Sequence, residues 1–201
     1  MYVPTVFAVD DRSRLVEFIE RHPFGILVSH VGGELFAAHV PFIVLERAER
    51  LTLALHVAKA NPLAREAAHG KALAIFRGPH AMISAGWYEH PEASVPTWNY
   101  SAVHCSGTVH LANEKEMLAI LERTVELFEP AWRMQHADAN YIAGMVRGIT
   151  AMRIEVTHVD AKFKYSQNRS EQDRRRVVAA LEHSARPEDR EVAAAMREML
   201  S

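Results

Sequence analysis

The chain of 201 residues is long enough to bury a substantial core, and its 49% hydrophobic content suits one compact domain with or without a helical appendage. A formal net charge of -2 excludes an overall basic bias toward nucleic acid or a membrane surface. The single Cys105 excludes an internal disulfide framework, and no apolar run suits a membrane span or a signal peptide, so we expect a cytoplasmic protein.

In the first half of the chain, an extended opening precedes a helix and several strands. The predicted segments are an extended stretch at 1–9 that supplies a strand, a helix from Asp10 or Asp11 to His22, strands at 24–30, 34–45 and 51–58, a short helix at 61–68, and strands at 71–77 and 80–84. Gly32-Gly33 indicates a hairpin turn. Pro41 predicts a bulge, a bend or an edge, and Gly78-Pro79 predicts a break between two strands.

The second half contains an aromatic loop, further strands and most of the helical periodicity. The predicted segments are a loop at 86–95, strand-rich residues at 96–112 with a bulge at Gly107, helices at 113–128 and 138–146, strands at 150–158 and 161–166, and a charged helical region from Ser170 that Pro187 divides. Six or seven strands with hairpin-sized links predict an α+β fold with an antiparallel, barrel-like sheet. We expect residues 1–168 to form this domain and residues 169–201 a helical appendage.

Residues 51–68 change their periodicity in the middle. Apolar residues alternate up to Val57, as in a strand, and helix signals begin at Asn61 and Pro62. A strand that leads into a helix N-terminus leaves backbone N–H groups without partners, and Lys59 adds a positive charge beside them. This corner predicts a site for a phosphate or a carboxylate. The alternative is that Asn61 only caps the helix and Lys59 is solvated.

Residues 95–100 place an indole, an amide and a phenol on three successive residues, Trp98, Asn99 and Tyr100. These groups suit a planar heteroaromatic ligand, which needs stacking on its face and hydrogen bonds at its edge. The alternative is that Trp98 and Tyr100 are core residues on one strand face while Asn99 points to solvent.

Residues 162–169 alternate lysines with aromatic residues. Lys162 and Lys164 share one strand face, where two ammonium groups repel each other and a bound anion would relieve the repulsion. A solvated sheet face is the alternative.

The twelve histidines have no recognised metal-site spacing, and no cysteine pair supports a zinc site, so we expect no metal. Cys105 has only His104 as a neighbouring base, and successive side chains on a strand point to opposite faces. We interpret Cys105 as a core residue and find no catalytic nucleophile.

A series of motifs makes the chain resemble the PaiB family, FMN-binding proteins often labelled negative transcriptional regulators. The motifs extend from residue 1 to about residue 176 and are, in order, MYVP, HPFGILVSH, AAHVPF, HVAKANP, FRGPHAMIS, VPTWNY and KYSQNR. Each is weak alone, but their occurrence together in this order is specific.

The resemblance implies an FMN-binding split β-barrel and a homodimer that binds FMN where the two barrels meet. HVAKANP looks like the flavin phosphate site, AAHVP like the strand along the isoalloxazine edge, and PTWNY and SQN like the remaining pocket walls, from the same or the partner subunit. The implied cofactor-binding residues are Ala38, His39, Val40, Lys59, Asn61, Trp98, Asn99, Lys164, Ser166, Gln167 and Asn168.

Three functions remain open after this resemblance. In a flavin-dependent oxidoreductase, FMN would be the reactive group and His39 the candidate group near the flavin edge, with the substrate open. In a regulator, we expect an indirect effect and no direct DNA binding, because no helix-turn-helix is visible and acidic residues surround the basic run 174–176. The third function is haem binding, because related split barrels bind haem.

Overall fold

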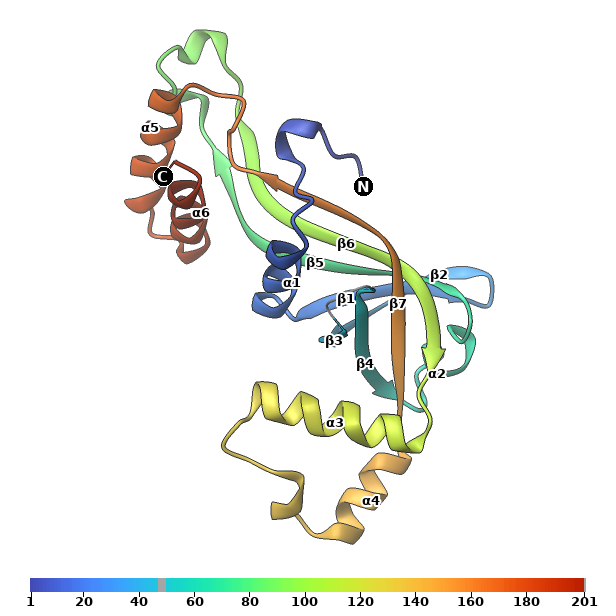
Figure 1. The fold of residues 1–201 in the computed structure, drawn as a ribbon. Coiled ribbons are helices and arrows are strands. Elements are labelled where there is room, and N and C mark those ends of the chain that lie inside the picture. The colour runs from blue at the N-terminus through green and yellow to red at the C-terminus, as the bar shows by residue number, and fades with distance from the viewer. Residues whose placement is uncertain (47–49, 201) are drawn as a thin grey trace. The chain divides into compact units, whose positions relative to one another are not determined.

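The computed structural model describes residues 1–46 and 50–200. Within them, seven strands form one sheet in the order β2-β1-β5-β6-β7-β4-β3, and every registered strand pair is antiparallel (Figure 1). The predicted α+β class and strand number are confirmed. The strands are β1 (Phe24–Val31), β2 (Glu34–Pro41), β3 (Ile43–Glu46), β4 (Thr52–Ala58), β5 (Lys71–Ile83), β6 (Thr97–Leu111) and β7 (Ile149–Lys164).

Six α-helices and four short 3-10 turns lie among the described residues. The α-helices are α1 (Arg12–Arg21), α2 (Leu63–Glu66), α3 (Glu114–Phe128), α4 (Ala139–Arg147), α5 (Glu171–Glu182) and α6 (Pro187–Glu198), and the 3-10 turns are Thr5–Phe7, Ala85–Trp87, Pro91–Ala93 and Met134–His136. Asp11, Asn113 and Ser170 accept backbone hydrogen bonds at the starts of α1, α3 and α5, as their sequence positions predict.

The described chain divides into two compact units. The first unit contains residues 1–15, 77–103 and 160–200, and the second contains residues 16–46, 50–76 and 104–159. Strands β5, β6 and β7 contribute residues to both units.

In the second unit, β1 and β2 form a hairpin that Gly32 and Gly33 close. Their φ angles of +61° and +86° belong to a type I′ turn, and glycine adopts them without steric cost. Val31 pairs with Glu34 across the turn, and the register continues without interruption along both strands. The predicted hairpin is therefore confirmed, and β2 ends at Pro41 on an edge of the sheet.

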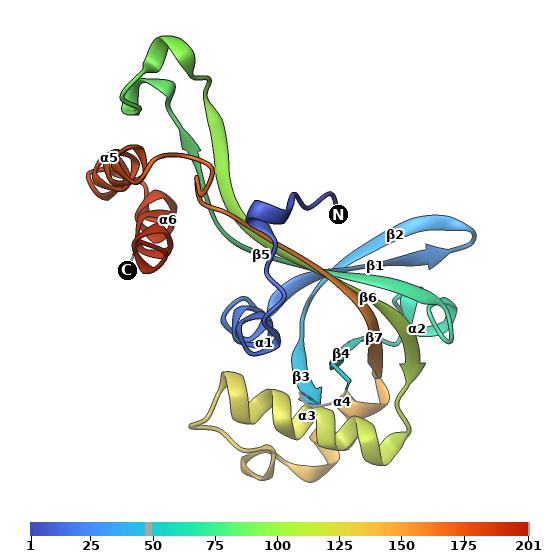
Figure 2. The same cartoon turned by 45° about the horizontal axis from the view of Figure 1, so that its top comes forward.

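Helix α3 covers part of the sheet in the second unit (Figure 2). The contact is a buried apolar cluster made of Ile43 on β3, Ala54 on β4, Ile120 on α3 and Ala151 on β7. A capping box between Asn113 and Glu116 fixes where this helix begins. The second unit thus has a core of its own.

In the first unit, α5 and α6 pack against each other. Their buried side chains are Val177, Val178, Leu181, Val192, Ala193 and Met196. The loop after β5 is held to α5, because Glu89 N donates to Asp173 Oδ1 at 2.8 Å. The Arg169 guanidinium lies 4.4 Å from the centre of the Tyr88 ring. These helices occupy the region predicted as the appendage, of which Ser201 lies outside the described residues.

Two predicted segments differ from the structure near the N-terminus and in β5. Residues 1–9 contain a 3-10 turn at Thr5–Phe7 instead of a strand, and Ala8 makes only an isolated bridge to Lys162. β5 continues through Gly78-Pro79, where the sequence predicts a break. The registered pairs of β5 with β1 end at Ile75, so the missing N–H of the proline removes no ladder bond to β1.

β7 is one strand where the sequence predicts two. Its backbone approaches β6 closely, because a Cβ at Gly107 would lie 2.3 Å from the Glu155 carbonyl oxygen. This contact accounts for the glycine within β6, where a bulge is predicted.

Candidate functional site

The outer edge of β2 carries backbone groups without strand partners. In the described sheet, β2 pairs with β1 and has no neighbour on its other side. A type I′ hairpin closes on a hydrogen-bonded pair, here Val31 with Glu34, and the two kinds of pair then alternate along the strands. The peptide groups of Leu35, Ala37 and His39 therefore face away from β1. A ligand along this edge meets both N–H donors and C=O acceptors.

The three β2 side chains predicted beside a flavin ring lie in different environments. His39 is exposed, Ala38 is half-buried and Val40 is buried. The rings of Phe24 and His39 are stacked, with centroids 6.4 Å apart and planes 28° from parallel. Phe24 is 69% exposed, so this edge also presents an accessible aromatic pair.

The corner after β4 differs from the expected helix N-terminus. α2 is a single turn of four residues, too short for a substantial dipole. Asn61 N donates to Ala58 O at 2.8 Å, and Asn61 Oδ1 accepts from Leu63 N at 3.0 Å. Lys59 N donates to Gly148 O at 2.8 Å. These three N–H groups at the corner are thus bonded within the protein, and the Asn61 side chain caps the turn.

The Lys59 side chain keeps its predicted availability. It is exposed and has no ion-pair partner among residues 1–46 and 50–200. The corner is also tied to the β1–β2 hairpin, because Gly32 N donates to Glu66 Oε2 on α2 at 2.6 Å. The turn of the β1–β2 hairpin is thus bonded to α2, and the Lys59 ammonium is left for an anion.

In the first unit, Trp98 points outward and Asn99 points inward. Trp98 is 51% exposed, and its ring is stacked with His80 at a centroid distance of 6.0 Å and an interplanar angle of 25°. Asn99 is fully buried. This is the reverse of the alternative in which the aromatic residues are core and the amide is solvated. Trp98 can therefore stack on a ligand.

Lys162 and Lys164 lie on the same part of the first unit as Trp98. The Lys162 ammonium lies 5.4 Å from the centre of the Tyr100 ring and 5.7 Å from that of Tyr2. Lys164 Nζ donates to Thr97 Oγ1 at 2.5 Å. Burial and the like charge of Lys162 lower the pKa of Lys164 below its ordinary value.

The other predicted wall residues are mostly bonded within the protein. The Ser166 hydroxyl accepts from Asn99 Nδ2 at 3.0 Å and donates to Asn99 Oδ1 at 3.3 Å. Gln167 Nε2 donates to Phe163 O at 2.5 Å, and its Oε1 accepts from Tyr165 N at 2.7 Å. These three polar side chains shape the segment after β7 and have little capacity left for a ligand.

Asn168 is exposed, so it remains accessible. The structure thus gathers Trp98, Asn99, Lys164, Ser166, Gln167 and Asn168 in the first unit, and Ala38, His39, Val40, Lys59 and Asn61 in the second.

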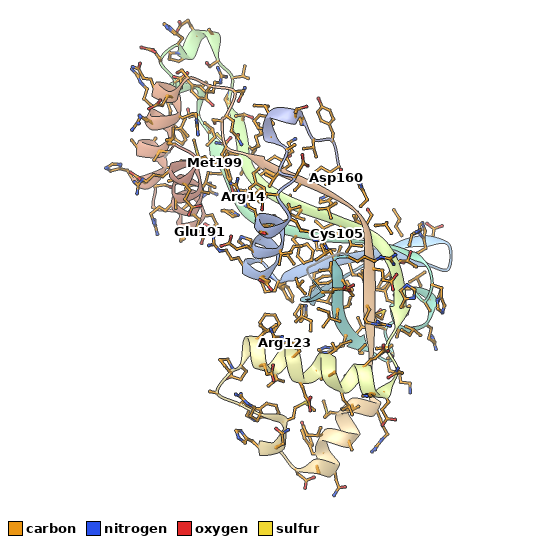
Figure 3. All side chains as sticks on the ribbon, viewed as in Figure 1. Arg14, Cys105, Arg123, Asp160, Glu191 and Met199 are labelled. Atoms are coloured by element: carbon orange, nitrogen blue, oxygen red, sulfur yellow. The ribbon has the colours of Figure 1, made fainter. Side chains whose placement is uncertain are left out.

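Three contacting residues escape the sequence prediction. His80 and Thr97 lie inside the quoted motifs FRGPHAMIS and VPTWNY, so the motifs were a signal for them. Met196 on α6 accepts a hydrogen bond from Asn99 Nδ2 at 3.4 Å, and nothing in the local sequence indicates this contact. Met199 lies directly after the same helix (Figure 3). Its carbonyl accepts a hydrogen bond from Arg174 Nη2 at 2.8 Å.

The reactive side chains offer little nucleophilic or metal chemistry. Burial raises the pKa of the Cys105 thiol to about 12, so the thiol stays neutral, as a core residue should. Burial also lowers the pKa of His56. No cluster of three or more potential metal-ligating side chains occurs in the described parts of the chain. None of the described helices combines the length and the apolar character needed to cross a lipid bilayer.

Comparison of the sequence with known proteins gives a family and a full-length relative. The family model described as "Putative FMN-binding domain" matches residues 1–158. The protein "Protease synthase and sporulation protein PAI 2" of Bacillus subtilis (strain 168) is 30% identical over 100% of this chain and 98% of its own length. An uncharacterized protein of Aspergillus fumigatus is 27% identical over 90% of this chain and 91% of its own length.

Solved structures share the fold at low sequence identity. The flavocytochrome Anf3 from Azotobacter vinelandii has a TM-score of 0.62 and 14% identity, and the match covers 79% of this chain and 69% of that one. The FAD and heme binding protein from Mycobacterium smegmatis has a TM-score of 0.58 and 15% identity, with 86% and 78% covered. These likenesses confirm the split-barrel fold.

The family match extends over more than half of the chain, and the relative from Bacillus subtilis spans all of it. Both agree with the motif series and with FMN as the cofactor that the sequence predicts. The chain therefore belongs to the family of FMN-binding domains that includes the PaiB protein, and it has the FMN-binding split-barrel fold.

Proposed function

We propose that the protein is a homodimeric FMN-binding protein in which the outer edge of β2 lies along the isoalloxazine ring and Lys59 binds the phosphate. The observation that carries this proposal is the unpaired edge of β2 at Ala37 and His39, together with the exposed Lys59 after β4 in the same unit. When bound, FMN supplies the redox chemistry.

The residues present fit the chemical groups of FMN. The isoalloxazine edge contains carbonyl oxygens and nitrogens, which need donors and acceptors in one plane, and an unpaired strand edge provides both. The phosphate needs a cation, and the Lys59 ammonium has no carboxylate partner among the described residues. Burying a polar group of the ligand costs free energy unless that group is hydrogen-bonded. The strand edge for the ring and Lys59 for the phosphate are therefore both required.

In this proposal, the predicted residues at 98–99 and 164–168 also contact FMN, from the same or the partner protomer. Trp98 and Lys164 present a ring face and an ammonium, whereas Asn99, Ser166 and Gln167 position the backbone around them. The exposed Asn168 is a further polar group for the rim.

A homodimer would cover apolar side chains that the single chain exposes. Met82 at the end of β5 is 43% exposed, and Val95 just before β6 is 70% exposed. With Trp98 they are three large exposed apolar side chains of the first unit, which a second copy would cover in this proposal. Light scattering of the purified protein should give twice the 22.6 kDa mass of the chain. A mass of one chain at micromolar concentration would remove the dimer from the proposal.

Mixed dimers can show whether the two residue groups of one pocket come from one protomer or from two. A Lys59→Ala protomer and a Trp98→Ala protomer each lose affinity alone. If each pocket combines Lys59 of one protomer with Trp98 of the other, mixing restores one intact pocket per mixed dimer. If both come from the same protomer, mixing restores none.

The phosphate assignment is tested by comparing FMN with riboflavin, which lacks the phosphate. Lys59→Ala should weaken FMN binding about tenfold or more, because a charge-assisted hydrogen bond is lost, and should leave riboflavin binding unchanged. Lys115→Ala, an exposed lysine on α3, is the matched control. Unchanged FMN affinity in Lys59→Ala would remove the assignment.

A regulatory role would act through the flavin or through a protein partner in this proposal. The relative from Bacillus subtilis has a name that links it to protease synthesis and sporulation. In the basic run of α5, Arg175 pairs with Glu171 at 2.6 Å and Arg174 donates to Met199 O. Two of its three arginines are thus engaged within the protein. Tight, strongly salt-dependent binding to a promoter fragment would instead show direct DNA contact.

A further inference from the structure

Residues 113–148 of the second unit leave the sheet and return to it with almost no buried side chain. The chain runs from the end of β6 through α3 and α4 and re-enters the sheet at β7 (Figure 1). Of these residues, all of which the structure describes, only Ile120 is buried. Tyr141 and Met145, one turn apart on α4, are 63% and 55% exposed. A helix of nine residues is marginal in water unless it packs against another element, so we expect a partner to cover this segment.

One side of α3 alternates carboxylates with apolar side chains. Its members are spaced by three or four residues, which places them along a single line of the helix surface. They are Glu114, Leu118, Glu122, Val125 and Glu129, here called the acidic–apolar stripe. Leu118 is exposed and Val125 is half-buried, so both apolar side chains of the stripe are accessible.

The stripe does not face the sheet. Ile120 lies in the buried cluster with residues of β3, β4 and β7, and Met117 packs against the same cluster. Leu118 follows Met117 by one position and is therefore turned about 100° around the helix axis from it. The stripe thus belongs to a side of α3 that the cluster leaves uncovered.

The three carboxylates of the stripe have no cation beside them. In the described parts of the chain, none of Glu114, Glu122 and Glu129 forms an ion pair. The other two glutamates of α3 each pair with an arginine, at 3.1 Å and 3.2 Å. The stripe therefore offers negative charge and apolar surface together.

This combination selects among the surfaces that could cover the stripe. A second copy packed through a two-fold axis would place the same stripe on both sides and bring carboxylates against carboxylates. A membrane surface with anionic headgroups would be repelled in the same way. A basic amphipathic helix would instead supply cations to the carboxylates and apolar side chains to Leu118 and Val125.

We propose that the acidic–apolar stripe of α3 is a docking site for an amphipathic helix of another protein, with lysine or arginine flanking its apolar residues. The apolar residues of that helix pack on Leu118 and Val125, and its cations pair with Glu114, Glu122 and Glu129. The stripe contains none of the residues assigned to the flavin site. Docking therefore requires no FMN, and failure of the flavin assignment would leave this proposal intact.

Two synthetic peptides of 15 residues, the length of α3, test the charge preference. Both carry leucine at helical spacing, and their polar positions are lysine in one peptide and glutamate in the other. Isothermal titration of the full-length protein should show about tenfold or more tighter binding of the lysine peptide. Glu122→Gln and Glu129→Gln should each reduce this preference severalfold. Glu191→Gln, at an exposed position on α6, is the matched control and should retain the preference.

The apolar contact is tested with Leu118→Ser, which should weaken binding of the lysine peptide severalfold. Its mass by light scattering should equal that of the wild type. A halved mass would assign the stripe to a second copy of the chain and overturn the proposal. If Leu118→Ser fails to fold, the glutamine variants and added salt on the wild type still test the charge dependence.

Hydrogen exchange shows where the lysine peptide binds. Bound peptide should slow amide exchange within residues 113–148. Slowed exchange confined to other residues, equal binding of the two peptides, or an unchanged preference in both glutamine variants would each overturn the proposal. Slowed exchange in this segment, together with a preference that the glutamine variants lose, supports it.

Discussion

Asn99 on β6 and Met196 on α6 are joined by a hydrogen bond from Nδ2 to Sδ at 3.4 Å, across 97 positions of the sequence. Both side chains are fully buried. The same amide exchanges two hydrogen bonds with Ser166, which has a left-handed φ of +62°. The C-terminal helices are therefore fastened to the strand that carries Trp98.

Met196→Ala should destabilise the protein by about 2–5 kcal/mol, because it removes a fully buried side chain and leaves a cavity. Met196→Leu should cost less than about 1.5 kcal/mol, because it conserves volume. Urea unfolding measures both values. Met82→Ala, at an exposed position, is the control and should change stability little. An effect of Met196→Ala as small as that of the control would show that α6 is not fastened to β6.

Gly107→Ala should destabilise the protein by about 3 kcal/mol or more. The added Cβ would lie 2.3 Å from the Glu155 carbonyl oxygen, so the β7 backbone would have to move. Gly86→Ala is a matched control, because its Cβ would meet only the Ser84 hydroxyl at 3.5 Å. Thermal melting of the two variants should separate them clearly, and equal melting temperatures would contradict the close approach of β6 and β7.

The stability contribution of Lys164 should depend on pH. Its folded-state pKa lies below the ordinary value of 10.5, so the unfolded chain keeps the proton to higher pH. The protonated form therefore disfavours folding below the folded-state pKa, and this cost disappears as pH rises through the window up to 10.5. Lys164→Met should be more stable than the wild type at pH 7, and the gain should shrink as the pH approaches 10.5. Lys115→Met, at an exposed position on α3, is the control in chemical unfolding across the same pH range.

Cys105 should be unreactive in the native protein. The side chain is fully buried and burial raises its pKa to about 12, so little thiolate exists at pH 8. Iodoacetamide should leave the native protein unmodified by mass spectrometry and should alkylate one site after unfolding in guanidinium. Rapid labelling of the native protein at pH 8 would show that this part of β6 opens to solvent.

Local sequence chemistry was sufficient to predict the β1–β2 hairpin and the residues at which helices begin. Gly32-Gly33 is one of the few dipeptides that favour a type I′ turn, and Asn113 followed by Glu116 is a capping box. Both signals act between residues a few positions apart, so no knowledge of the fold is needed to use them. The same holds for Lys59, whose exposure follows from its place after a strand.

The sequence could not reveal contacts that depend on distant segments. The burial of Asn99 depends on Ser166 and Met196, which lie far along the chain. At the corner after β4, the N–H group of Lys59 is bonded because the distant Gly148 supplies its carbonyl. In the same way, β5 tolerates Pro79 because its registered pairing with β1 has already ended. Each outcome is decided by tertiary pairing that periodicity does not report.

The most direct measurement is the visible absorption spectrum of the FMN-free protein during titration with FMN. Tight uptake of one FMN per protomer, with perturbed flavin bands and about tenfold or more weaker uptake by Lys59→Ala, is the result expected from the β2 edge and the Lys59 corner. A parallel titration with haemin tests the alternative cofactor. A protein that leaves the flavin bands unchanged at all FMN concentrations, or that takes up haemin and not FMN, would contradict FMN binding by this chain.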